Sequence, residues 1–191
     1  MINPITQRLP DYIEVCKKKC RIHTSFRVWI RVSLLIYENI DLETKLINLI
    51  KLCYIDIPPT LKDGIQGIFL FLSGGEDNTN EKCTSTKKAL FDFDADAGYI
   101  YAAFLKEYGV DLSVCDMHWH KFLALFNALP QECEFLKIVS YRGADLSKIK
   151  DKEQRSFIRR MKIRYALPDK RSDEEKDRDI LNELEGLFNT E

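Results

Sequence analysis

The chain of 191 residues has no long apolar run. A strongly apolar run such as Ile68 to Leu72 is far shorter than the roughly 20 residues that a membrane-spanning helix needs. The opening residues MINPITQRLPDY show no basic patch followed by an apolar stretch, which is the pattern of a secretory signal. Apolar residues still make up 45% of the chain, so a globular core is expected. We therefore expect a soluble cytoplasmic protein without a membrane partner.

Net charge is also nearly absent. Lysine and arginine number 29, and aspartate and glutamate number 30, which leaves a net charge of −1 at pH 7. Such a chain has no general field that attracts nucleic acid, so no nucleic-acid partner is expected. The one basic concentration, residues 148–164, places Arg155, Arg159 and Lys162 on one helical face. We interpret it as the solvated face of an amphipathic helix.

Residues suited to catalysis are few. Three histidines are present, and the sequence contains none of GxSxG, HExxH or GxGxxG. Six cysteines form no CxxC pair, which favours free thiols, although Cys16 and Cys20 are candidates for facing each other across a hairpin. We expect no catalytic residue, no bound metal and no cofactor.

Two of the histidines lie in the stretch DMHWHKFLALF. On the helix expected there, His118 and His120 are about 200° apart and do not share a metal ion. We interpret the stretch as a helix N-terminus that Asp116 caps, with Asp116 also pairing with His120. The alternative is a zinc site built from residues of metal-binding type around this stretch: Cys115, His118, and Cys133 or His23.

Three aspartates alternate in FDFDADAGY, in the manner of a calcium loop. These are Asp92, Asp94 and Asp96. A calcium loop needs a glycine at its sixth position and a glutamate at its twelfth, whereas this sequence has Ala97 and Ala103 there. We interpret the aspartates instead as acids grouped at a helix N-terminus, where they complement the helix dipole.

Apolar spacing predicts a mainly α, multi-helix protein with a short N-terminal β-hairpin. The hairpin is expected within residues 12–24, where a lysine cluster occupies the turn. Helices are expected over residues 26–40, 42–52, 60–72, 94–108, 116–129, 131–141 and 151–166. The expected N-terminal caps are Thr24 and Ser25, Asp41 and Asp94, and either Pro59 or Thr60 begins the third helix. Gly109 is expected in a left-handed C-terminal position, and the pair Pro58-Pro59 is expected to end the second helix.

Composition divides the chain into four parts. Residues 1–72 hold the hairpin and the first helices, and residues 73–90 form a flexible polar linker. Residues 91–169 form a C-terminal helical body. Residues 170–191 form a charged tail with a short amphipathic helix, because the apolar residues at its end follow the helical period. Those residues are Ile180, Leu181, Leu184, Leu187 and Phe188.

Two helices and the tail are candidates for binding a partner. A helix that is apolar around most of its circumference is either buried or covered by another protein. The helix over 26–40 contributes Trp29, and the helix over 60–72 contributes Phe69 and Phe71. The tail contributes Leu184, Leu187 and Phe188. Each helix is equally suited to the core, and both interpretations stay open.

Seven stretches occur in a characteristic order: LPDYIEV, FRVWI, IPPTLKDGIQGIFLFLSGG, ALFDFDADAGYIYAAFLKEYGVDL, MHWHKFLALFNALP, FLKIVSYR and MKIRYALPD. Together they resemble the small tail proteins encoded beside the tape-measure gene in long-tailed bacteriophages and prophages of Gram-positive bacteria. The similarity covers about residues 9–169. Its pattern residues, which we expect to be structural, are Trp119, Phe122, Phe135, Ile138, Tyr141 and Arg142.

The resemblance implies a tail assembly chaperone that acts by binding, without catalysis. Such a protein binds the tape-measure protein, keeps it soluble and promotes assembly of the tail tube, with the major tail-tube protein as a further candidate partner. It is expected to act in several copies or as a homo-oligomer in the cytoplasm of the bacterial host, and to be missing from the mature virion. The alternatives are a structural tail or connector subunit retained in the virion and, third, a metal-dependent enzyme.

Overall fold

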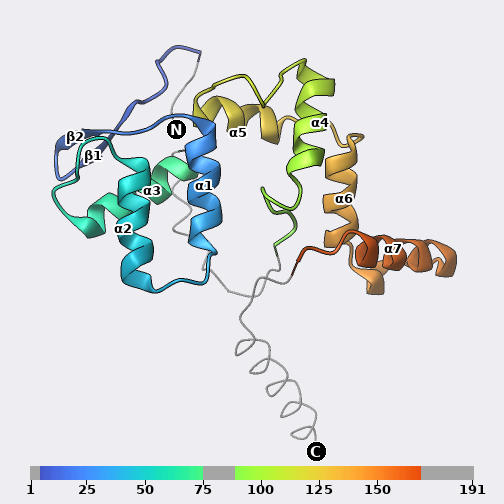
Figure 1. Ribbon diagram of the computed structural model, residues 1–191. Coiled ribbons are helices and arrows are strands. Elements are labelled where there is room, and N and C mark those ends of the chain that lie inside the picture. Colours follow the sequence, from blue (N-terminus) through green and yellow to red (C-terminus); the bar gives the residue numbers. More distant parts are fainter. Residues whose placement is uncertain (1–4, 75–88, 169–191) are drawn as a thin grey trace, which may run out of the picture.

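The computed structural model describes residues 5–74 and 89–168 (Figure 1). These residues form seven α-helices and one antiparallel two-stranded hairpin at the N-terminal end, which confirms the predicted fold class. Residues 75–88 of the expected linker and the whole expected tail lie outside the described residues. Within the described residues, no helix combines the length and apolar character needed to cross a membrane.

The hairpin consists of β1 (Tyr12–Val15) and β2 (Lys18–Arg21), joined by a two-residue turn. The turn residues Cys16 and Lys17 have φ angles of 51° and 63°. Positive φ at both central positions is the geometry of a turn whose twist matches that of the flanking strands. The lysine cluster thereby reaches solvent, as the sequence predicts.

The two cysteines of the hairpin do not face each other. Cys20 is opposite Ile13 in the strand register and is fully buried, whereas Cys16 lies in the exposed turn. The alternative in which they face each other is therefore excluded, and both cysteines are free thiols, as predicted. The Cys16 thiol donates a hydrogen bond to Asp63 over 3.1 Å, and this bond raises the pKa of Cys16.

Three helices follow the hairpin: α1 (Phe26–Ile36), α2 (Leu42–Cys53) and α3 (Leu61–Leu72). The predicted cap at Asp41 is confirmed, because Asp41 accepts the backbone N–H of Thr44. Of the two residues expected to begin α3, Thr60 caps it by accepting the backbone N–H of Asp63. The first helix is shorter than the predicted span of 26–40.

The end of α2 is set by a strand contact and not by prolines. The helix stops at Cys53, and Tyr54 adopts an extended conformation that forms a β-bridge with Ile22. The backbone N–H of His23 also donates to the carbonyl of Cys53 over 2.8 Å. The prediction that Pro58-Pro59 ends this helix was wrong, because pairing with the segment after the hairpin takes over the backbone five residues earlier.

Two glycines let α3 approach its neighbours closely. A Cβ atom on Gly67 would lie 2.5 Å from Cγ2 of Ile13 on β1, and one on Gly64 would lie 2.8 Å from Cγ of Pro58. Such separations are well below van der Waals contact. The absence of side chains at these two positions therefore allows α3 to lie against the hairpin and the segment between α2 and α3.

The second half contains four α-helices and a short 3₁₀ helix, η2 (Leu146–Lys148). The α-helices are α4 (Ala97–Tyr108), α5 (Trp119–Asn127), α6 (Glu134–Gly143) and α7 (Lys152–Arg164). All four fall within or near predicted spans. Gly109 ends α4 with a φ of 64°, which confirms the predicted left-handed position. Asp151 caps α7 by accepting the backbone N–H groups of Glu153 and Gln154.

Both halves of the chain contribute to one continuous core. Figure 1 shows α5 between α1 and α4. Its Phe122 stacks on Phe26 of α1 and on Phe104 of α4, in each case with ring centroids 5.1 Å apart. The indole N–H of Trp119 donates to the carbonyl of Leu72 over 3.0 Å. The N-terminal helices and the C-terminal helices are therefore joined by packing as well as by the chain between them.

Candidate functional site

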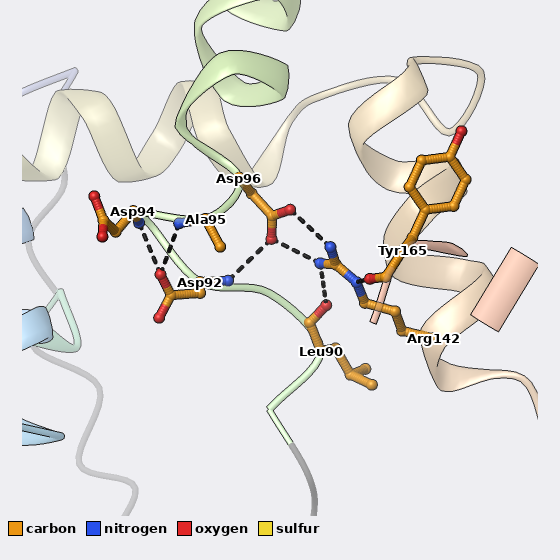
Figure 2. Close-up of polar contacts among 7 residues, drawn as sticks. All are labelled: Leu90, Asp92, Asp94, Ala95, Asp96, Arg142 and Tyr165. Atoms are coloured by element: carbon orange, nitrogen blue, oxygen red, sulfur yellow. Dashed lines mark hydrogen bonds and ion pairs between the residues drawn. The ribbon is translucent and has the colours of Figure 1, made fainter. Parts of the chain in front are cut away.

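The most buried charged group of the described residues lies where α4 begins. The side chain of Asp96 is 1% exposed, and that of Arg142 on α6 is 9% exposed. The two form a bidentate ion pair, in which Nη1 and Nη2 of Arg142 donate to the two carboxylate oxygens over 2.7 and 2.8 Å (Figure 2). This parallel geometry makes an arginine–carboxylate pair both strong and specific in direction.

Arg142 also binds two backbone carbonyls that are far apart in the sequence. Its Nη1 donates to Leu90 over 3.1 Å, and its Nε donates to Tyr165 over 2.6 Å. The carboxylate of Asp96 accepts a further hydrogen bond from the backbone N–H of Asp92 over 3.0 Å. One arginine thus connects the segment before α4, the start of α4 and the end of α7. Because Nε, Nη1 and Nη2 of Arg142 all donate to these groups, the pair is suited to positioning these segments and not to proton transfer.

The three alternating aspartates have separate structural tasks. Asp96 occupies the N-cap position of α4 and binds Arg142. Asp92 accepts the backbone N–H groups of Asp94 and Ala95, each over 2.9 Å, and so forms a turn ahead of the helix. The predicted N-cap at Asp94 was therefore wrong, because this turn delays the helix by two residues.

The two histidines near α5 lie together, contrary to prediction. His118 occupies the N-cap position with an extended backbone, so the angular spacing of a helix does not apply to it. The rings of His118 and His120 have centroids 5.1 Å apart, and both contact Phe71. Nδ1 of His118 accepts the backbone N–H of His120. The predicted capping and pairing by Asp116 were wrong, because Asp116 instead accepts a hydrogen bond from Ser25 over 2.7 Å.

Both imidazoles hold backbone carbonyls from the N-terminal half. Nε2 of His118 is 2.9 Å from the carbonyl oxygen of Pro10, and Nε2 of His120 is 2.9 Å from that of Phe71. Burial lowers the pKa of His120. Neutral rings with Nε2 protonated satisfy these contacts. Within residues 5–74 and 89–168, no group of three or more His, Cys, Asp or Glu side chains is arranged to hold a metal ion, Cys115 and Cys133 included.

The aromatic residues proposed for partner binding divide between core and surface. Trp29 is fully buried and Phe71 is 5% exposed, and their rings contact each other with centroids 4.4 Å apart. Both therefore belong to the core and are not accessible to a partner in this conformation. Phe69, on the other side of α3, is 48% exposed. The remaining proposed residues, Leu184, Leu187 and Phe188, lie outside the described part of the chain.

Most residues of the family-like pattern are in the core. Four of them are at most 2% exposed: Trp119, Phe122, Phe135 and Ile138. Tyr141 is half-buried, and its ring contacts those of Phe157 and Tyr165. Arg142 forms the ion pair described above. These residues pack in the core or, in the case of Arg142, bind other parts of the chain. A surface for a partner must therefore consist of other residues.

Exposed apolar side chains concentrate on α2, α3 and the segment between them. Ile57 is 81% exposed, Leu42 is 70% exposed and Leu70 is 45% exposed. We name this set the α2–α3 apolar surface, and it consists of Leu42, Ile47, Ile55, Ile57, Leu61, Phe69 and Leu70. Sequence reasoning found only Phe69 among them. The missed signal is the pair of alternating isoleucines in YIDIPP, which lie in the connection between α2 and α3 and are 50% and 81% exposed.

An ion pair fixes part of this surface. Arg21 of β2 donates from Nε and Nη2 to the two carboxylate oxygens of Asp56, over 2.9 and 3.0 Å. These hydrogen bonds lower the pKa of Asp56 to about 2. Asp56 lies between Ile55 and Ile57, so its attachment to the hairpin leaves both isoleucines pointing away, 50% and 81% exposed.

A small, partly open hollow lies between α1 and α4. It has a volume of about 190 Å³ and is lined mostly by apolar side chains, among them Ile30, Phe93 and Ile100. Ligand pockets commonly measure about 300–1,000 Å³ and carry several convergent polar groups. Size and lining therefore both argue against a small-molecule site here.

Comparison with known proteins supplies the remaining evidence. Neither the curated proteins nor the solved structures gave a match to this chain. A family model does match it over residues 5–167, which include both described segments almost completely. That family carries the description bacteriophage Gp15 protein, and the chain belongs to it.

Proposed function

We propose that this protein is a tail assembly chaperone that binds the tape-measure protein, keeps it soluble and promotes assembly of the tail tube around it. Membership of the bacteriophage Gp15 family supports a structural or assembly role in a phage. The narrower proposal rests on the resemblance of the sequence to tail proteins encoded beside the tape-measure gene. It is a proposal of binding without catalysis, in the cytoplasm of the infected cell.

The observation that carries the proposal is the α2–α3 apolar surface. Its seven members range from 38% to 81% exposed, and they lie on adjacent helices and the short segment that joins them. Large exposed apolar side chains on neighbouring elements are candidates for a site where another protein binds. A long helical client presents apolar stripes of its own, and covering them in this way keeps such a client from aggregating.

Several copies on one client follow from the same argument. The α2–α3 apolar surface spans helices of 12 residues each, which are about 18 Å long at 1.5 Å per residue. A tape-measure protein is far longer than that, so one copy shields only a short part of it. We propose that multiple copies bind along the client and that the tail-tube protein displaces them.

Co-expression with the tape-measure protein tests the proposal. The tape-measure protein is expected to become soluble and to copurify with a tagged form of this chain. The variant Phe69→Asp/Leu70→Asp places two charges on the α2–α3 apolar surface and is expected to abolish both effects. Val114→Asp is the matched control, because Val114 is 79% exposed on the segment between α4 and α5 and its change should leave capture intact. A client that stays insoluble and uncaptured with the unmodified chain contradicts the proposal.

A structural subunit retained in the virion is the competing function, since family membership supports an assembly and a structural role equally. Mass spectrometry of purified particles separates the two. A chaperone is expected to be missing from mature tails, whereas a tail or connector subunit is present in stoichiometric copies.

A further inference from the structure

The helix α7 is attached to the body along one side. Its packing partners are α6 and η2, and none of its residues is buried. Figure 1 shows it projecting beyond α6 at the edge of the molecule. Two inward contacts fix it: Nζ of Lys162 donates to the carbonyl of Ala144 over 2.7 Å, and the carbonyl of Tyr165 accepts from Arg142. The opposite side of α7 is left to solvent.

That outward side is strongly basic. Across its length α7 has six basic residues and one acidic residue. We name its outward side the α7 basic face, and it consists of Lys152, Ser156, Arg159, Arg160, Ile163 and Arg164, all of them exposed. Among the described residues, none of its four cations forms an ion pair.

The α7 basic face also carries apolar side chains that a simple solvated face does not need. Ile163 is 73% exposed in the middle of the cations, and Phe157 at the edge of the face is 41% exposed. A surface that combines cations with exposed apolar groups fits an acidic amphipathic segment better than it fits a nucleic acid. Protein surfaces that bind nucleic acids do so mainly through contacts with phosphates and through stacking of aromatic rings on bases.

A segment with this chemistry follows α7 directly in the sequence. Residues 173–188, DEEKDRDILNELEGLF, contain seven acidic and two basic residues. Their apolar positions, from Ile180 to Phe188, recur at the helical period. The charge is opposite in sign to that of α7, and the apolar stripe matches the exposed Ile163 and Phe157.

The length of the connection allows contact within one chain. Residues 169–179 span up to about 37 Å when fully extended. The helix α7, with its 13 residues, is about 20 Å long. The segment can therefore reach any point of the α7 basic face. A short tether also gives a docking segment an effective concentration of the order of millimolar, which lets a weak contact persist.

We propose that residues 173–188 of this chain dock on the α7 basic face of the same molecule. The acidic residues bind the outward arginines, and the apolar stripe covers Ile163 and Phe157. The surface and the segment then shield each other until a partner with a better match displaces one of them. This inference does not depend on the proposed chaperone function, because it concerns two parts of one chain.

Backbone relaxation measured by NMR on the full-length protein tests the inference. Order parameters of residues 180–188 are expected above about 0.6, the boundary between ordered and flexible backbone. In the variant Arg159→Glu/Arg160→Glu/Arg164→Glu they should fall below it. Adding Asp173→Lys/Glu174→Lys/Glu175→Lys to that variant should restore them, because the charges are opposite again. The matched control is Arg8→Glu/Arg31→Glu/Lys51→Glu, which reverses three exposed cations away from α7 and should change nothing.

Four results overturn the inference. Order parameters below about 0.6 in the unmodified protein exclude docking. High values that survive the α7 reversal place the segment elsewhere. If the order parameters of residues 180–188 rise with protein concentration and sedimentation shows a dimer, the segment binds a second copy of the chain. If a short DNA or RNA duplex shifts the α7 amide resonances while reversal of the acidic residues leaves them unchanged, the face binds nucleic acid instead.

Discussion

Replacing Arg142 by methionine removes the cation from the ion pair with Asp96 and keeps an unbranched side chain of similar length. The change deletes the two hydrogen bonds to the carboxylate and the bonds to the carbonyls of Leu90 and Tyr165. Asp96 then keeps one donor, the backbone N–H of Asp92, with a side chain that is 1% exposed. A buried carboxylate is left without a countercharge.

The expected loss of unfolding free energy is large. Removing one partner of a buried ion pair costs about 3–5 kcal/mol, because the remaining charge stays desolvated. Domains of this kind are stable by only about 5–15 kcal/mol, so Arg142→Met should bring the protein close to unfolding. The double variant Asp96→Asn/Arg142→Met should lose less unfolding free energy than Arg142→Met alone, because a neutral amide tolerates burial without a cation.

Urea denaturation followed by tryptophan fluorescence measures these differences, because Trp29 and Trp119 both lie in the core. Trypsin provides a local measurement. The end of α7 is held by the bond from Arg142 to Tyr165, so cleavage within α7 should accelerate in Arg142→Met before the whole protein unfolds. A loss below about 1 kcal/mol, or a double variant as unstable as the single one, would refute the reasoning.

Three further predictions concern packing and pH. Gly67→Ala should lower the unfolding free energy by about 1–3 kcal/mol, because the added methyl group overlaps with β1. Gly98→Ala on α4 should raise it by about 0.5–1 kcal/mol, because the methyl group there meets open space. Thermal melting of both variants checks these two changes. Phe122→Ala should lower the unfolding free energy by about 3–5 kcal/mol, because Phe122 is fully buried. Phe69→Ala should lower it by less than about 0.5 kcal/mol, because Phe69 is exposed. Equal losses for the two variants in urea denaturation would contradict this difference in burial. Burial lowers the pKa of His120 from 6.5, so the unfolded chain takes up the proton first and stability should fall as the pH drops below 6.5. His120→Gln keeps a donor near the carbonyl of Phe71 and should weaken this dependence of stability on pH. If denaturation at several pH values gives the same dependence for the variant, His120 is not its source.

Local signals in the sequence predicted most of the fold. The caps at Asp41 and Thr60 depend on hydrogen bonds to residues three positions away, and the end of α4 depends on Gly109 alone. Two of the wrong cap predictions have one cause: Ser25 stands at the N-cap position of α1 without a side-chain cap bond, and Asp116 does not cap α5. Ser25 and Asp116 were each expected to act locally, yet they bind each other across 91 positions in the chain. A contact between the two halves replaced both predicted interactions, and periodicity carries no information about it.

The candidate site was harder to predict for the same reason. The sequence singled out Asp96 and Arg142 separately, but nothing local pairs residues 46 positions apart. The side of α3 that faces the core was also undetermined, because the helix is apolar on both sides. The ring of Phe71 is covered by Trp29 and His120, whereas Phe69 is 48% exposed. Burial of Phe71 thus depends on a histidine from the second half of the chain.

The shared core has a consequence for synthesis on the ribosome. The residues of α1 and α3 leave the ribosome before residues 118–122 have been translated, so Phe26 lacks the cover of Phe122 and Phe71 lacks that of His120 when they first emerge. At about 5–20 residues per second, several seconds pass before the covering helix follows. The nascent first half is therefore itself an aggregation-prone chain for that interval. A translational pause before α5 should lower the yield of folded protein, and the same pause after α6 should not.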